Sequence, residues 1–259
     1  MNLKKKIYEK IIANSKIPNI NGYVNTYNDN LLNNIEEKYF INDLKNGSGN
    51  ELDKKFKALW SSSTLVVNNF VPFVKNIRKI IFYNSVFENA GFEKKLPTGL
   101  GGTPPNIDFF MEKSDLLIGI ESKYLEITDE TKSEFVDKYF SINYLNNDFK
   151  KLMGKYNKKI GYLDTAQLLK HSIGLIKYKI ETGKKIMLYY IYWTPTNWCD
   201  FYEYEKHENE LKIFSEEINA TKQIEFKSLR YFDIWEEFEK QTILEKSIKN
   251  IRNRYEIKV

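Results

Sequence analysis

Residues 104–124 read PPNIDFFMEKSDLLIGIESKY, and this stretch decides the fold. Two short segments of β-type composition, 106–111 and 116–124, lie on either side of the polar, turn-like EKSD of residues 112–115. Short apolar runs bounded by polar turn residues are typical of strands. The stretch therefore predicts a β-hairpin.

The hairpin brings two carboxylates and a lysine together. Side chains alternate along a strand, so Gly119, Glu121 and Lys123 share one face of the second strand. A tight hairpin brings Asp108 of the first strand alongside Glu121. Two carboxylates with a lysine beside them predict a divalent-metal site with an attached proton-handling group. A half-exposed hairpin with these residue types also occurs in proteins that have no such site.

Phosphodiester hydrolysis is the chemistry that needs this set. Asp108 and Glu121 would hold Mg²⁺, which lowers the pKa of an attacking water and binds phosphate oxygens. Lys123 would orient or deprotonate that water, or stabilise the negative charge that develops. Mg²⁺ keeps several waters, so two or three carboxylates suffice.

The rest of the chain alternates helical and strand patterns. This order predicts an α/β fold with a mixed central β-sheet flanked by helices, without a linker that would split residues 1–259. Within this single domain we expect a helical N-terminal extension (1–45), a catalytic core (47–195) and a C-terminal α/β elaboration (196–259). Helices are predicted over 4–13, 31–44, 51–60, 61–70, 75–83, 164–181, part of 199–219 and 233–249, and further strands over 91–96, 186–193, 223–229 and 254–259.

The helix over 164–181 is the clearest in the sequence. Apolar residues recur at spacings of three and four and predict a buried stripe, with Gly183 ending the helix. A second stripe lies on another face, which is either an exposed polar surface or a wall of the site. The buried stripe is Ala166, Leu169, Ile173, Ile176 and Ile180, and the second stripe is Gln167, His171, Gly174 and Tyr178.

Composition narrows the chemistry. The chain has 259 residues, 42% hydrophobic and 29% charged, which is typical of a globular protein. One cysteine and two histidines exclude a disulfide framework and a Cys/His zinc site. Any metal must then be held by oxygen, which favours Mg²⁺, Mn²⁺ or Ca²⁺. No apolar run is long enough to cross a membrane and no secretory signal is present, so we expect a reducing cytoplasm.

Positive charge is concentrated after the hairpin. The net charge is +5 over the whole chain. Residues 132–185 carry a net +7, whereas residues 200–240 carry a net −6. A basic run of this kind is either a solvated face or a surface that contacts nucleic-acid phosphates. The candidate phosphate-contacting residues are Lys150, Lys151, Lys158 and Lys159.

PPNID…GIESK resembles the signature of the PD-(D/E)XK nuclease superfamily. Four further segments, in order, resemble a group of restriction-endonuclease-like proteins, although Trp60 stands where a histidine is expected. The similarity covers about residues 47–178 and implies a restriction-endonuclease-like core. The segments are GSGNEL (47–52), KALWSSSTLVVNNF (57–70), FEKKL (92–96) and DTAQLLKH (164–171).

The resemblance implies further roles. Gln167 would contribute to catalysis and His171 to nucleic-acid binding, while Glu51 and Glu93 would add carboxylates to the metal site. The implied activity is a Mg²⁺-dependent DNA endonuclease of restriction or defence type, with Mn²⁺ as an alternative metal. Cleavage of both strands favours a homodimer. Two alternatives stay open: a catalytically inactive nucleic-acid-binding module of a larger complex, and a nuclease that acts on RNA.

Overall fold

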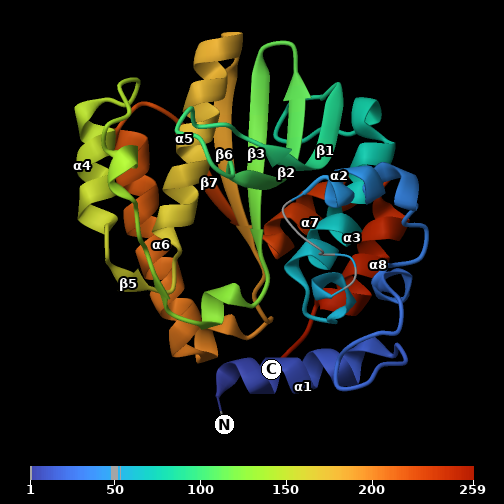
Figure 1. The fold of residues 1–259 in the computed structure, drawn as a ribbon. Helices are drawn as coiled ribbons and strands as arrows, with labels where there is room; N and C mark the ends of the chain where they lie inside the picture. The colour runs from blue at the N-terminus through green and yellow to red at the C-terminus, as the bar shows by residue number, and fades with distance from the viewer. Residues whose placement is uncertain (1, 48–51, 53) are drawn as a thin grey trace.

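In the computed structural model a five-stranded sheet lies between two groups of helices (Figure 1). The structure describes residues 2–47, 52 and 54–259. The strand order is β1-β2-β3-β6-β7, and the first three strands are antiparallel while β6 and β7 run parallel to β3. This confirms the predicted α/β fold with a mixed sheet. The strands are β1 (Asn89–Lys95), β2 (Asn106–Lys113), β3 (Leu116–Lys123), β6 (Lys185–Tyr192) and β7 (Glu225–Arg230).

The predicted hairpin is β2 and β3. Lys113 pairs with Leu116, so the turn contains only Ser114 and Asp115. Strand β3 is central in the sheet and its residues from Leu117 to Ser122 are buried on both faces. Helices cover both sides of β3, whereas β2 alternates buried and partly buried residues. Burying the charged side chains at the end of β3 costs free energy, so these side chains need specific partners.

Helix α5 (Thr165–Thr182) covers one face of the sheet beside β6 (Figure 1). The Asp164 side chain accepts a hydrogen bond from the Gln167 backbone N–H, and Gly183 ends the helix at φ 72°. The predicted apolar stripe is buried except at Ile180, which is 55% exposed in the last turn. The second stripe is not an exposed face, because His171 and Gly174 are also buried.

Helix α3 (Ser62–Lys75) covers the opposite face together with α7 (Tyr231–Glu239) and α8 (Glu245–Tyr255) (Figure 1). Phe70 stacks on Phe109 of β2 at 4.4 Å between ring centroids. Ser61 caps α3 by accepting a hydrogen bond from Thr64 N. Pro72 lies inside the helix rather than interrupting it, since a proline removes only one helical hydrogen bond when packing holds the rest.

Several sequence predictions differ from the structure. The segment over 31–44 is helical only in a 3₁₀ turn and in α2 (Ile41–Lys45). Short 3₁₀ turns, Lys55–Lys57 and Ile77–Lys79, replace long helices in the described parts of 51–60 and 75–83. The predicted helix over 233–249 is divided between α7 and α8. The predicted strand over 254–259 is wrong, because α8 continues to Tyr255 and the remaining residues join no sheet.

The remaining elements complete the layers. One continuous hydrophobic core contains residues from the N-terminal, central and C-terminal parts of the chain. Among the described residues, none of the helices combines the length and the apolar character that crossing a membrane requires. The other elements are α1 (Leu3–Ser15), α4 (Asn147–Tyr156), α6 (Tyr202–Ala220) and a small sheet of β4 (Thr131–Lys132) with β5 (Ile160–Gly161).

His207 of α6 makes the stability of this fold sensitive to acid. Its side chain is fully buried, with Nε2 2.9 Å from the Tyr190 hydroxyl, and burial lowers the pKa of its imidazole from 6.5 to about 3. The unfolded chain therefore binds a proton at pH values where the folded chain does not. The free energy of unfolding should fall as the pH falls from about 6.5 toward 3. Urea unfolding at pH 7 and pH 5 should show a smaller loss for His207→Gln than for the wild type, and equal losses would contradict this origin.

Candidate active site

The register of the hairpin places Asp108 opposite Glu121. Phe109 pairs with Ile120, so the next pair toward the open end of the hairpin is Asp108 and Glu121. Asp108 Oδ2 accepts a hydrogen bond from the Ser122 backbone N–H at 2.7 Å. The structure thus brings the two predicted carboxylates onto one face of the sheet, at the end of β3.

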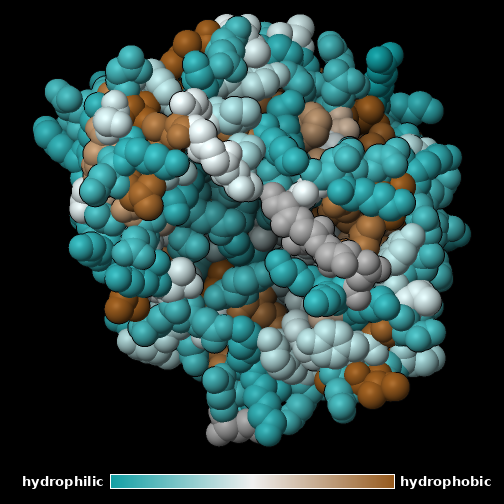
Figure 2. Space-filling model, in the orientation of Figure 1, coloured by the Kyte–Doolittle hydropathy of each residue, from teal (hydrophilic) through white to brown (hydrophobic). Residues whose placement is uncertain are grey.

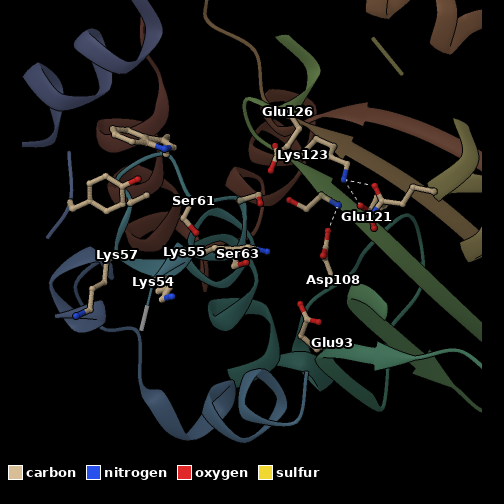
Figure 3. A pocket seen from close by; sticks show the side chains of 16 residues that line it. Lys54, Lys55, Lys57, Ser61, Ser63, Glu93, Asp108, Glu121, Lys123 and Glu126 are labelled. Carbon is tan, nitrogen blue, oxygen red and sulfur yellow. Dashed lines mark hydrogen bonds and ion pairs between the residues drawn. The ribbon is translucent and has the colours of Figure 1, made fainter. Parts of the chain in front are cut away.

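Lys123 connects the sheet to α5. Its Nζ lies 2.7 Å from Glu121 Oε1 and donates a hydrogen bond of 2.6 Å to Gln167 Oε1 (Figure 3). Gln167 lies in the first turn of α5, where the Asp164 cap fixes the start of the helix. Gln167 therefore contacts the lysine directly, and both residues line the same cavity as Asp108 and Glu121.

His171 lies behind Glu121 rather than on the surface. Its side chain is 3% exposed, and Nε2 lies 2.9 Å from Glu121 Oε2, an ion pair when the ring is protonated. A side chain with this burial does not reach a nucleic acid, so the predicted binding contact of His171 is not supported. The geometry instead gives His171 a role in holding the Glu121 carboxylate.

Burial and charge set the protonation of this group. Burial raises the pKa of the Asp108 carboxyl well above its ordinary value, and the neighbouring Glu121 carboxylate raises it further. Burial would also raise the pKa of Glu121, but the Lys123 ammonium and His171 outweigh it and lower that pKa to about 2. The pKa of Lys123 is raised, because the carboxylates around it outweigh the effect of its burial. Glu121 and Lys123 are therefore both charged in this structure.

Glu93 approaches the same place from β1. The register Phe92–Phe109 and Lys94–Ile107 puts Glu93 opposite Asp108, and Figure 3 shows its carboxylate directed toward Asp108. Glu93 has φ 50°, a left-handed conformation that is uncommon for a residue with a side chain. Strain of this kind is concentrated at functional sites. Glu93 Oε2 also accepts a hydrogen bond of 3.1 Å from Asn106.

The carboxylates line one side of a cavity of about 690 Å³. Figure 2 shows the surface hollowed among hydrophilic residues near the lower end of β3, and Figure 3 shows lysines and serines across the cavity from the carboxylates. We call this second side the lysine wall: Lys54, Lys55, Lys57, Ser61, Ser62 and Ser63.

Sequence reasoning missed the three lysines of the lysine wall. The residues of the wall lie just before α3 and in its first turn, so the start of this helix brings Ser61–Ser63 to the cavity. Tyr23, Trp60 and Glu126 line the cavity as well, and Trp60 stacks on Tyr8 at 4.2 Å. The signal that could have found the wall is the lysine-rich 54–57 run, which is followed after three residues by the serines 61–63.

The other predicted residues lie elsewhere. Lys150 and Lys151 are on α4, Lys158 and Lys159 follow it, and none of the four lines the cavity. Lys159 Nζ lies 4.9 Å from the Tyr156 ring centroid, and Lys151 faces Asp148 of its own helix at 3.5 Å. Their contact with nucleic acid stays a prediction. Glu51 lies outside the described residues.

The oxygen donors fit a cation that needs few protein ligands. Within the described ranges no group of three or more His, Cys, Asp or Glu side chains is arranged to hold a metal ion. Mg²⁺ is commonly held by one or two carboxylates, with waters in its other positions. Asp108 lies opposite Glu121 on one face of the sheet, and both carboxylates line the cavity. Asp108 and Glu121 are therefore the residues that would hold it.

The two carboxylates should have opposite effects on stability without added metal. Asp108→Asn removes the repulsion between neighbouring carboxylates and keeps an oxygen that can accept from Ser122 N, so it should raise the melting temperature in EDTA. Glu121→Gln leaves Lys123, whose side chain is 14% exposed, without its anion. It should lower the free energy of unfolding by about 1–3 kcal/mol, less than for a fully buried pair. Thermal and urea unfolding measure both changes, and the same sign for both variants would contradict the arrangement.

The comparisons with known proteins agree with this geometry. Residues 5–256 match a protein family described as restriction endonuclease associating with ARP. No curated protein and no solved structure matches the chain. The family match extends over nearly all the residues that form the sheet, the covering helices and the cavity. The chain therefore belongs to the family of restriction endonucleases associating with ARP.

Proposed function

We propose that this protein is a Mg²⁺-dependent endonuclease that hydrolyses DNA phosphodiester bonds, with Mn²⁺ as an alternative metal. One observation carries the proposal. Asp108, Glu121 and Lys123 meet at the buried end of a hairpin and face a cavity whose opposite side is the lysine wall. A phosphodiester between these two sides would have carboxylates for a cation on one side and positive charge on the other.

The carboxylate side would bind the metal. Asp108 and Glu121 supply oxygen ligands, and Glu93 is a third carboxylate at the same end of the sheet. Bound Mg²⁺ supplies Lewis-acid polarisation of the scissile phosphate and a lower pKa for the attacking water. A bound cation would offset the cost of ionising Asp108 beside Glu121, which links the affinity for the cation to the burial of both groups.

Lys123 acts as a fixed positive charge in this proposal. A raised pKa keeps the ammonium protonated at neutral pH, so the group suits the stabilisation of developing negative charge better than the removal of a proton. Gln167 holds the ammonium through its Oε1 and acts as a positioning residue. His171 holds Glu121 from the other side.

The lysine wall would bind the phosphates that flank the scissile bond. Phosphate contacts fix the position of a nucleic acid without reading its sequence. Tyr23 is 50% exposed at the cavity, where an aromatic ring can stack on a base that leaves the helix. The intact Asp–Glu–Lys set favours an active enzyme over a binding module.

Two partners follow from this proposal. The family description names an association with ARP, and we extend this association to the chain as part of the proposal. A single cavity contains one set of catalytic side chains, so cleavage of both DNA strands favours two copies of the chain acting together.

Cleavage of supercoiled plasmid tests the activity. Wild-type protein should nick the plasmid with Mg²⁺ and not with EDTA. Asp108→Asn should abolish nicking although the fold is kept, and Lys123→Ala should do so as well. Gln167→Ala should reduce the turnover rate by about ten- to a thousandfold with little change in KM, because only the position of Lys123 changes. Full activity of Asp108→Asn would refute the proposed site, and cleavage of RNA but not of DNA would reassign the substrate.

DNA titrations can compare the lysine wall with the four lysines on and after α4 that the sequence predicted to contact phosphates. Lys54→Ala with Lys57→Ala should weaken DNA binding and lower the slope of log K against log salt by about 0.9 for each phosphate that the protein no longer neutralises. Lys212→Ala, a charge change on the exposed side of α6, is the matched control and should leave both unchanged. Reversal of Lys150, Lys151, Lys158 and Lys159 to Glu tests the sequence prediction in the same titrations. An unchanged slope in the double variant would remove the lysine wall from the substrate site.

A further inference from the structure

A second cleft, of about 600 Å³, lies where the end of α1, the loop over 29–33 and α8 meet. It is separate from the catalytic cavity, since the two share no lining residue. Its lining is rich in cationic and amide side chains: Asn14, Lys16, Asn33, Asn250, Asn253 and Arg254.

Arg254 is a buried cation without a counter-ion in this cleft. Its side chain is 8% exposed, and its guanidinium has five N–H donors. The hydrogen bond that the structure gives to this guanidinium goes from Nη2 to Asn30 Oδ1. Nη1 is buried and has no hydrogen-bond partner in the described ranges, where no carboxylate forms an ion pair with Arg254 either. A buried charge in this state costs free energy until an anion approaches it.

The acidic residue of the cleft does not supply that anion. Asp29 lines the cleft, but its Oδ2 accepts hydrogen bonds from Thr26 N at 2.7 Å and from Thr26 Oγ1 at 2.9 Å. The Asp29 carboxylate therefore stabilises the turn that begins at Thr26. Lys16, at the end of α1, adds a second positive charge to the lining.

We propose that the Arg254 cleft binds a phosphate group. Phosphate suits the lining better than a carboxylate does, because it has more oxygens and so accepts from more of the cationic and amide donors at once. The cleft also has room for a group larger than the ion alone. This inference goes beyond the proposed nuclease function and does not depend on it.

The cleft is connected to the catalytic cavity through Asn30. The Asn30 side chain accepts from Arg254, and its Nδ2 donates to the carbonyl oxygens of Phe56 and Ala58 at 2.7 Å each. Ala58 lines the catalytic cavity. A phosphate on Arg254 would thus be linked, through the Asn30 side chain, to the segment that carries the lysine wall. Its source is either the backbone of a bound nucleic acid or a free phosphate compound.

Binding of inorganic phosphate to the full chain tests the site. Calorimetry with EDTA present, at an ionic strength matched with sodium chloride, should show phosphate binding to the wild type. Arg254→Gln should weaken it by about tenfold or more, since the variant has lost the charged guanidinium donors. Lys16→Asn should weaken it less, and the φ of 51° at this position suits asparagine, so the fold is kept. Lys212→Ala, on the exposed side of α6, should leave phosphate binding unchanged, while Lys57→Ala reports any phosphate that binds at the lysine wall instead.

Three outcomes would overturn the proposal. They are no binding to the wild type, equal binding to the wild type and to both cleft variants, and loss of binding in Lys57→Ala but not in Lys16→Asn. A DNA titration then identifies the source of the phosphate. A lower affinity and a smaller salt slope for Lys16→Asn assign the cleft to a backbone phosphate, whereas an unchanged DNA titration with weaker phosphate binding assigns it to a free phosphate compound.

Discussion

The contact between Glu121 and Lys123 is the interaction on which the rest of the site depends. Glu121 is 1% exposed, and a carboxylate so deep in a protein is stable only beside positive charge and hydrogen-bond donors. Lys123 meets this requirement two residues along the same strand, and His171 meets it from α5. Because His171 is on α5 and Lys123 donates a hydrogen bond to Gln167 of the same helix, the packing of α5 and the charge of Glu121 depend on each other.

The opposite pKa shifts of Asp108 and Glu121 follow from the same contact. Lys123 stabilises the charge on Glu121, while Asp108 lies nearby with a backbone N–H as its hydrogen-bond donor. The partners thus shift the pKa values of these two neighbouring carboxyls in opposite directions. Ionising Asp108 beside Glu121 costs free energy, and a bound cation would offset that cost.

Much of this could be predicted from the sequence, for identifiable reasons. The hairpin, the succession of the core strands along the chain and the 164–181 helix follow from periodicity and from turn residues, which are local features of the sequence. The pairing of Asp108 with Glu121 follows from the two-residue alternation of strands. The burial of His171 could not be predicted from periodicity, because it depends on how α5 packs against the sheet. The lysine wall is local in sequence, but its position across the cavity from Asp108 and Glu121 depends on the tertiary fold. The Arg254 cleft joins residues that only the tertiary fold brings together, as do the links from Asn30 to Phe56 and to Arg254.

The left-handed backbone of Glu93 has a consequence beyond the site. Strand β1 is at one edge of the sheet, and its outer side is free of a neighbouring strand in the described topology. An edge that is long and flat is a template on which another chain can add a strand, and natural proteins interrupt such edges with bends and with lysines. The turn of the chain at Glu93, followed by Lys94 and Lys95, interrupts this edge. The distortion that directs a carboxylate into the cavity therefore also protects the sheet against strand-by-strand aggregation.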